Sequence, residues 1–258
     1  WINRFLYRGE NAYPLLDKWI EEESQHWQPE NPWDIQLSPA VIDMYKFYGM
    51  LPIGDTCRNG SWKYNYNLET KKKWYGKFGG IDNEVERPRF HESLRKEKQK
   101  LLDLAEEVRR NPEVDLFQAY PEIFTRDKMS GEQHIPFING ISGEPEARLI
   151  LNLQNRGVIS GIPDDVVVEI PVIVSKDNIQ PEKLDPDVTE RTKNMYLMPR
   201  ILRMRWALEA YTTGDKRVLE EILVRDPRTK SFEQVKAVLE EIMSLPINEE
   251  IARYFGYK

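Results

Sequence analysis

The sequence predicts a helix-rich domain of the α+β (α/β) class. Apolar residues recur at helical spacing near both ends of the chain, while two apolar runs in its middle suit strands. Of the 258 residues 40% are hydrophobic, which is enough for a substantial core. Residues 181–187 are the nearest thing to a linker and are few, so we expect one domain over residues 1–258.

Two helices are predicted before residue 50. The first covers residues 13–23, where four apolar residues share one face and acidic residues fill the other. The second begins at Ser38 and Pro39, a good N-cap and first-turn pair, and ends at Gly49.

The segment 52–76 differs from its surroundings because it combines Asp55 and Arg58 with turn formers and a dense run of aromatic residues. Its glycines, proline and asparagines interrupt any periodic apolar face. We therefore expect a long ordered loop. Long loops in compact domains usually serve binding, cover an active site or contact another subunit, so this segment is the best candidate for chemistry.

The remaining elements follow in order along the chain. Residues 86–110 predict a charged helix with a narrow apolar stripe. The runs 148–153 and 166–174 predict strands, and Pro171 indicates an edge strand or a bulge. Residues 195–211 predict a helix that Gly214 breaks, and Ser231 with its downstream glutamine predicts a capped final helix.

Composition excludes several classes of function. The formal net charge is −6, so no overall positive field recruits nucleic acid or an anionic membrane. A single cysteine, Cys57, excludes an internal disulfide and fits a reducing, cytoplasmic setting. No run approaches the ~18 apolar residues of a membrane span, and the first residues lack the basic start and apolar middle of a signal peptide. Because the sequence begins inside an apparent strand at Trp1, we expect it to start partway through a longer protein.

Common catalytic and cofactor motifs are missing. The chain has no glycine-rich GxGxxG turn, no P-loop and no GxSxG nucleophile motif. The three histidines, His26, His91 and His134, show no metal-ligand spacing with one another or with Cys57. A nucleotide or metal would therefore be held mainly by residues outside this sequence.

Five sequence blocks resemble the C-terminal portion of the family four glycoside hydrolases, in the same order and over essentially the whole chain. The match is best with the α-glucosidase and α-glucuronidase branch. The blocks read GMLPIGDTCRNGSWKYNYNLETKKKWYG, SGEQHIPFI, LNLQNRGVISGIPDDVVVEIP, YLMPRILRMRWALEA and RDPRTKS.

The resemblance implies a fold like the C-terminal half of lactate and malate dehydrogenases, helix-rich with a mixed or antiparallel sheet. It also implies an upstream Rossmann domain that binds NAD, and an upstream Cys and His that bind Mn²⁺. In that family NAD oxidises the sugar at its third carbon, a base removes the neighbouring proton, the glycosidic oxygen leaves, water adds and the hydride returns. This is an exception to the paired-carboxylate scheme of ordinary glycosidases.

Carried over to this sequence, the resemblance places the catalytic base at Asp55 and a substrate-side arginine at Arg58. A carboxylate held in a turn suits proton abstraction, although Asp also commonly caps turns. A guanidinium suits sugar hydroxyls or a uronate, although Arg58 could equally form an ion pair with Asp55 or another acid.

Other candidates are weaker. Tyr45 and Tyr48 could supply a base, but their helical spacing favours packing. His134 is a weak candidate for the substrate or cofactor side, because the residues around it also suit a packed helix start. Asn155 and Arg156 are more simply explained as a structural turn.

The aromatic residues of segment 52–76, among them Trp62, Tyr64, Tyr66, Trp74 and Tyr75, lie close to three lysines and are typical of single-stranded nucleic-acid binding. The acidic charge and the family blocks argue against that function. We expect these side chains to order the loop and to contact another subunit in a homodimer or homotetramer.

The function that results is an NAD- and Mn²⁺-dependent α-glycosidase acting on unphosphorylated α-glucosides or α-glucuronides. The residues leave two alternatives open: an NAD-dependent dehydrogenase of a small 2-hydroxy acid, and a noncatalytic assembly domain. The sequence does not decide between glucoside, glucuronide and galacturonide, and we expect the fragment alone to be inactive.

Overall fold

The computed structural model describes residues 1–121, 123–124 and 131–257. Helices dominate, and the strands form a two-stranded and a three-stranded antiparallel sheet. The N-terminal half contains β1 (Leu6–Tyr7), β2 (Glu10–Asn11), α1 (Tyr13–Glu22), η1 (Ser24–His26), α2 (Pro39–Tyr48), α3 (Asp55–Asn59), η2 (Trp62–Tyr64), α4 (Leu68–Tyr75), α5 (Glu86–Arg110) and α6 (Leu116–Ala119). The C-terminal half contains α7 (His134–Ser142), β3 (Ala147–Gln154), β4 (Val167–Ser175), β5 (Asn178–Pro181), α8 (Glu190–Thr192), the π-helical segment η3 (Lys193–Leu197), α9 (Met198–Thr213), α10 (Lys216–Val224), α11 (Phe232–Met243), η4 (Pro246–Asn248) and α12 (Glu249–Tyr254). The predicted helix-rich fold with an antiparallel sheet is confirmed.

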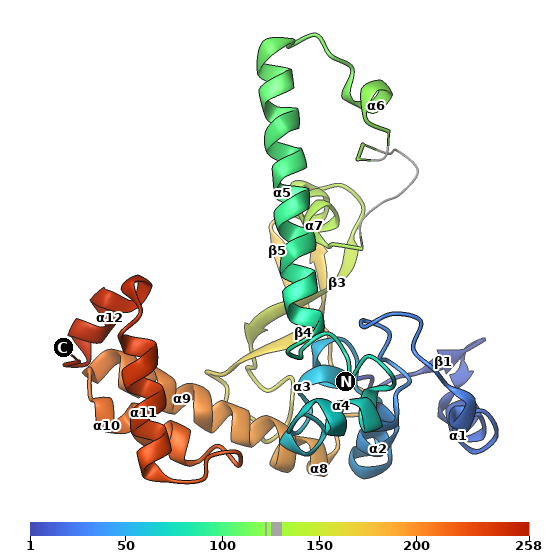
Figure 1. Cartoon of the computed structure of the whole chain (residues 1–258). Coiled ribbons are helices and arrows are strands. Elements are labelled where there is room, and N and C mark those ends of the chain that lie inside the picture. The colour runs from blue at the N-terminus through green and yellow to red at the C-terminus, as the bar shows by residue number, and fades with distance from the viewer. Residues whose placement is uncertain (122, 125–130, 258) are drawn as a thin grey trace.

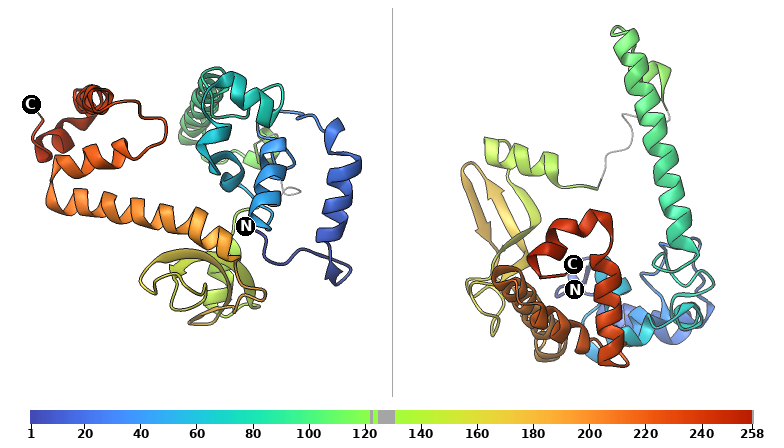
Figure 2. Two further views of the ribbon diagram at one scale, coloured as in Figure 1. Left: turned by 90° about the horizontal axis from the view of Figure 1, so that it is seen from below. Right: turned by 60° about the vertical axis from the view of Figure 1, so that its left-hand side comes forward.

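Two hydrophobic clusters form the body of the protein. One is built mainly by α1, α2 and the 55–75 segment, and it contains Met44, Cys57 and Tyr64. The other lies around the three-stranded sheet. The η3 segment and the start of α9 lie between them, as Figure 2 shows from below, because Tyr196 of η3 belongs to the first cluster and Ile201 of α9 to the second. Burying apolar surface on both sides fixes this helix to the body.

Two elements extend away from this body (Figure 1). Helix α5 projects as a long rod, and of its residues only Glu86 and Leu104 are buried. This agrees with the narrow apolar stripe that the sequence predicted for it. Helix α9 leads to the C-terminal helices, where α10 packs on α9 and α11 packs on α10.

Several predicted element ends are confirmed by backbone geometry. Helix α2 ends at Gly49, which adopts a left-handed conformation with φ 72°. Helix α11 begins after Ser231, whose side-chain oxygen accepts a hydrogen bond from the backbone of Gln234. The Gln234 side chain in turn accepts a bond from the Lys230 backbone N–H, at 2.8 Å. Both ends therefore satisfy backbone groups that the helix itself leaves without partners.

The prediction for Pro171 is wrong, because β4 is the central strand and its pairing with β3 runs without a bulge. Pro171 lies opposite Ile150, whose backbone N–H and C=O both bond the side chain of Gln133 at the outer edge of β3. In such a pair the backbone groups point away from each other, so the nitrogen of Pro171 faces β5. The named pairing of β5 ends at Pro181, opposite Val172, and just beyond it the Pro171 carbonyl accepts a hydrogen bond from the Glu182 backbone N–H at 2.9 Å. The proline therefore omits only one ladder donor, at the end of this pairing.

The prediction of one long loop over residues 52–76 is also wrong. Three short helices, α3, η2 and α4, divide it. Asn67 caps α4 through its side chain, and Tyr64 and Tyr75 are almost completely buried. The turn formers recognised in the sequence separate these helices instead of preventing them, and the buried tyrosines supply the core contacts that stabilise such short helices.

Candidate functional site

Asp55 lies at the first position of α3. Gly54 before it has φ 56° and ψ −133°, a conformation that side-chain-bearing residues rarely adopt, so glycine is needed for this sharp entry into the helix. The Asp55 side chain is 80% exposed. The structure therefore presents this carboxylate on an open surface, where a substrate can reach it.

Arg58 connects Asp55 to the body of the protein. Its Nη2 lies 2.6 Å from Oδ1 of Asp55, and its Nη1 lies 3.0 Å from Oδ2 of Asp82. The guanidinium also lies over the ring of Trp33, with its Cζ 5.4 Å from the ring centroid. Only 17% of the Arg58 side chain is exposed. The ion pair considered from the sequence is present, and both terminal nitrogens already have carboxylate partners.

Asp82 is a member of this site that the sequence reasoning missed. It follows Gly79 and Gly80, both at φ 70°, which turn the chain back toward α3. Its second oxygen lies 2.7 Å from Nη2 of Arg87 at the start of α5. The glycine pair before an aspartate was the available sequence signal, but only the tertiary structure brings Asp82 to Arg58.

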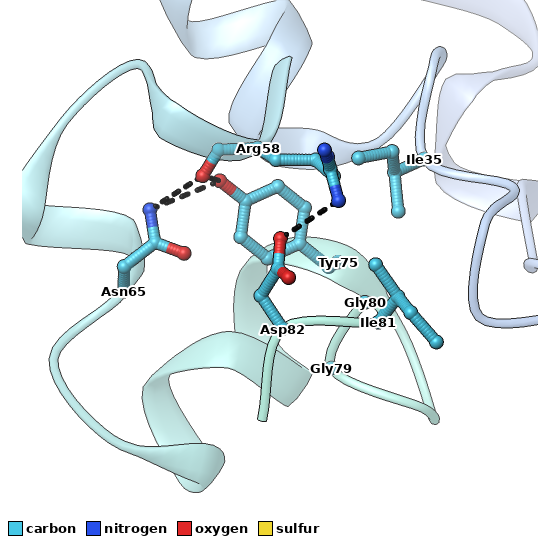
Figure 3. Close-up of a pocket in the computed structure, with 8 residues that line it drawn as sticks. All are labelled: Ile35, Arg58, Asn65, Tyr75, Gly79, Gly80, Ile81 and Asp82. Carbon is cyan, nitrogen blue, oxygen red and sulfur yellow. Dashed lines mark hydrogen bonds and ion pairs between the residues drawn. The ribbon is translucent and has the colours of Figure 1, made fainter. Parts of the chain in front are cut away.

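The space beside this cluster is small. Figure 3 shows Arg58, Asp82 and Tyr75 around a cavity of about 10 Å³, which is room for about one water molecule. A larger hollow of about 630 Å³ is lined by residues that include Asn3, Tyr13 and Asp187, and not by Asp55. A ligand that reaches Asp55 would therefore bind on the open side of α3.

His134 begins α7 and its side chain is exposed. Helix α7 packs on β3 and β4. Among the described residues, no hydrogen bond or ion pair joins His134 to Asp55 or Arg58. The structure therefore does not group His134 with the other two candidates. The first residue of its sequence block, Ser130, lies outside the described residues.

The two candidate tyrosines are engaged in packing. The Tyr45 hydroxyl donates to Asp17 at 2.8 Å, and its ring stacks on Tyr13. Burial, followed by the bond to Asp17, raises the pKa of Tyr45 well above its usual range. Tyr48 packs edge-on against Trp1, and burial raises its pKa as well. Both shifts oppose the loss of a proton, which supports the structural interpretation.

Asn155 and Arg156 form the structural turn that the sequence favoured. Asn155 is fully buried, and its side chain bonds the backbone of Ile159 and Ile162. Arg156 has φ 41° and contacts Gln154. Asn155 thus serves the turn and does not face a ligand.

A further arginine, Arg200, lies near the other end of α3. Its Nη2 donates to the backbone oxygen of Asn59 at 2.6 Å, and its Cζ lies 3.5 Å from the ring centroid of Tyr196. Burial lowers its pKa. No carboxylate of the described residues lies within ion-pair distance of Arg200. Arg200 is therefore a half-buried cation near α3 that has no carboxylate partner among the described residues.

The described residues do not form a metal site of their own. They contain no group of three or more His, Cys, Asp or Glu side chains that could hold a metal ion. The Cys57 thiol is buried and donates to Gln36 and to the backbone of Pro52. Burial raises the pKa of this thiol to about 11, which disfavours the thiolate that a metal requires. The described residues therefore do not form a complete metal site by themselves.

Comparison with known proteins gives one consistent family. The family described as family 4 glycosyl hydrolase C-terminal domain matches residues 1–229. An α-galacturonidase of Lachnoclostridium phytofermentans is 24% identical over 94% of this chain and 50% of its own length. An α-galacturonidase of Thermoanaerobacter italicus is 22% identical over 94% of this chain and 51% of its own length. The chain therefore spans about half the length of these relatives.

Solved structures show the same fold. The lplD protein of Bacillus subtilis, a candidate glucosidase, matches with a TM-score of 0.70 and 16% identity over 94% of this chain and 52% of that one. A 6-phospho-α-glucosidase from gut microorganisms, solved in complex with NAD and Mn²⁺, matches with a TM-score of 0.59 and 14% identity over 95% and 50%. Both likenesses concern the fold alone.

Proposed function

Because this chain belongs to the family 4 glycosyl hydrolases and matches their C-terminal domain, we propose that the full-length protein is an α-glycosidase of unphosphorylated sugars. The observation that carries the proposal is the exposed Asp55 carboxylate at the start of α3, held by a guanidinium that is itself largely buried. Such a carboxylate can accept a proton from a bound substrate without rearrangement of the core.

The residues of this chain have two roles in the proposed reaction. Asp55 removes a proton from a carbon of the sugar ring, and Arg58 orients Asp55 through the 2.6 Å contact. We propose that the enzyme uses NAD and Mn²⁺, bound by residues outside the described chain, for oxidation, elimination, hydration and reduction. A related fold that holds both cofactors supports this.

Three sugars are candidates for the substrate. The sequence favoured an α-glucoside or an α-glucuronide, and the names of two relatives add an α-galacturonide. We place the galacturonide first on the strength of those names. Arg58 is already paired with two acids and is therefore less available to a uronate carboxylate. Arg200, by contrast, has no carboxylate partner among the described residues. Arg200 is therefore our candidate for a uronate contact.

The test uses the full-length protein under reducing conditions with aryl α-glucoside, α-glucuronide and α-galacturonide, and with NAD and Mn²⁺ each supplied or withheld. We expect cleavage of one substrate only when both cofactors are present, without net NADH. Accumulation of NADH from a 2-hydroxy acid would instead support a dehydrogenase. Asp55→Asn should lower kcat by about 10²–10⁴-fold while the fold and NAD binding remain. Retained activity would refute the role of Asp55.

We propose a homodimer or homotetramer without nucleic-acid or membrane partners. Trp62 and Tyr66 are about half exposed, as side chains at a subunit contact would be before assembly. None of the helices in the described ranges is long and apolar enough to cross a membrane. Light scattering on the full-length protein tests the assembly, and a monomer would refute it.

A further inference from the structure

We propose that Asp82 is a positioning residue that fixes the Arg58 guanidinium and, through it, the carboxylate of Asp55. This inference rests on the proposed function and adds to it a residue that lies 27 positions after Asp55 in the sequence. The two acids bind different nitrogens of the same guanidinium, at 3.0 Å for Asp82 and 2.6 Å for Asp55.

The two carboxylates differ in how firmly they are held. Asp82 is 30% exposed, and its other oxygen lies 2.7 Å from Arg87. The backbone oxygen of Asp82 accepts a hydrogen bond from the Lys71 ammonium of α4. Asp55 is 80% exposed, and its carboxylate is held by Arg58. Asp82 therefore belongs to the fixed part of the site and Asp55 to its accessible part.

Arg58 is also fixed at its backbone. The Asn65 side chain donates to the backbone oxygen of Arg58 at 2.9 Å, and the Tyr75 hydroxyl lies 3.4 Å from the same atom. Figure 3 shows these contacts at one end of the residue and Asp82 at the other. With its main chain and one guanidinium nitrogen held, the other nitrogen has a defined position for Asp55.

Removing the carboxylate of Asp82 would leave one side of the guanidinium without a charged partner. The Arg58 guanidinium could then move together with the Asp55 carboxylate and would no longer hold it in one position. The Asp55 carboxylate would sample more orientations relative to the sugar. Small misplacements of a reacting group cost up to about 10²-fold in rate. Because Asp82 does not touch the substrate in this scheme, its loss should reduce kcat and leave KM nearly unchanged.

The experiment compares Asp82→Asn and Asp82→Glu in the full-length enzyme, with Asp226→Asn as the matched control. Asp226 is also a partly buried aspartate paired with an arginine, Arg228, but it lies after α10. We expect Asp82→Asn to lower kcat by about 10-fold or more with KM within about twofold, and Asp82→Glu to recover most of the loss. Asp226→Asn should leave kcat within about twofold of the unmodified enzyme.

A second measurement tests the contact without relying on activity. Thermal unfolding is followed for Asp82→Asn, Arg58→Met and the double variant. If Asp82 acts through Arg58, the melting shift caused by Asp82→Asn should be at least halved in the Arg58→Met background. Equal shifts in both backgrounds would overturn the inference.

The two proposals fail in different ways. An active enzyme whose kcat is unchanged by Asp82→Asn overturns the positioning role and leaves the glycosidase proposal intact. An unmodified enzyme that cleaves none of the three glycosides refutes the proposed function and the positioning role together, while the unfolding cycle still measures whether Asp82 holds Arg58.

Discussion

Replacing Asn155 by alanine should cost the protein a large part of its stability. The Asn155 side chain is fully buried and makes three hydrogen bonds to backbone groups: it donates to Ile159 O at 3.0 Å and to Ile162 O at 2.7 Å, and accepts from Ile159 N at 2.7 Å. Each net hydrogen bond contributes about 1 kcal/mol, and buried backbone groups left without partners add to the loss. We expect Asn155→Ala to lower the free energy of unfolding by about 3 kcal/mol.

For a protein of this size, that loss corresponds to a melting temperature lower by about 6–12 °C. Thermal and urea unfolding followed by circular dichroism measure it. Asn152→Ala is the control, because Asn152 lies on β3 of the same chain segment with an exposed side chain. It should change stability by less than about 0.5 kcal/mol. If Asn155→Ala behaved like the control, the turn would not depend on this side chain and our argument would be refuted.

Three further predictions concern packing, pH and the thiol. A methyl group added at Gly140 would meet the backbone oxygen of Val174 at 2.9 Å, so Gly140→Ala should destabilise the protein by about 1–3 kcal/mol in urea unfolding; an unchanged midpoint would contradict this close packing. The Arg228 guanidinium lowers the pKa of Asp226 from 3.8 to about 2, so stability that is present above pH 4 should be lost as the pH falls toward 2. After allowance for solvent screening the loss is about 1 kcal/mol, and it should disappear in Asp226→Asn. Burial raises the pKa of the Cys57 thiol to about 11, so iodoacetamide at pH 8 should alkylate it slowly in the folded protein and rapidly in urea; equal rates would show that the thiol is accessible.

Local signals in the sequence were sufficient for most elements outside the 52–76 segment. Gly49 and Gly214 end helices in the left-handed conformation that glycine permits. The charged stretch 86–110 coincides with α5, because its pattern repeats over many turns. The Val- and Ile-rich run became β4. For the helix ends and α5 the deciding interactions are between residues close in the sequence, and for β4 the β-branched composition itself signals a strand.

Predictions failed where distant contacts decide the outcome. In the 52–76 segment, turn formers at short intervals argued against helices, but Tyr64 packs on Trp74 and Tyr75 in the core, and this packing stabilises helices that are too short to form alone. Pro171 suggested an edge strand, but its place in the central strand depends on where β5 ends.

The sequence by itself determined the family and the helix-rich class, and it named Asp55 and Arg58 as candidate site residues that are close along the chain. One turn of α3 separates them, so their contact is local. Only the tertiary structure decided which acid holds the other side of the guanidinium, that His134 is not joined to these residues, and that Asp55 is open to solvent. These properties depend on how α3, α4 and the start of α5 pack together, and no short sequence pattern contains the relative placement of separate elements.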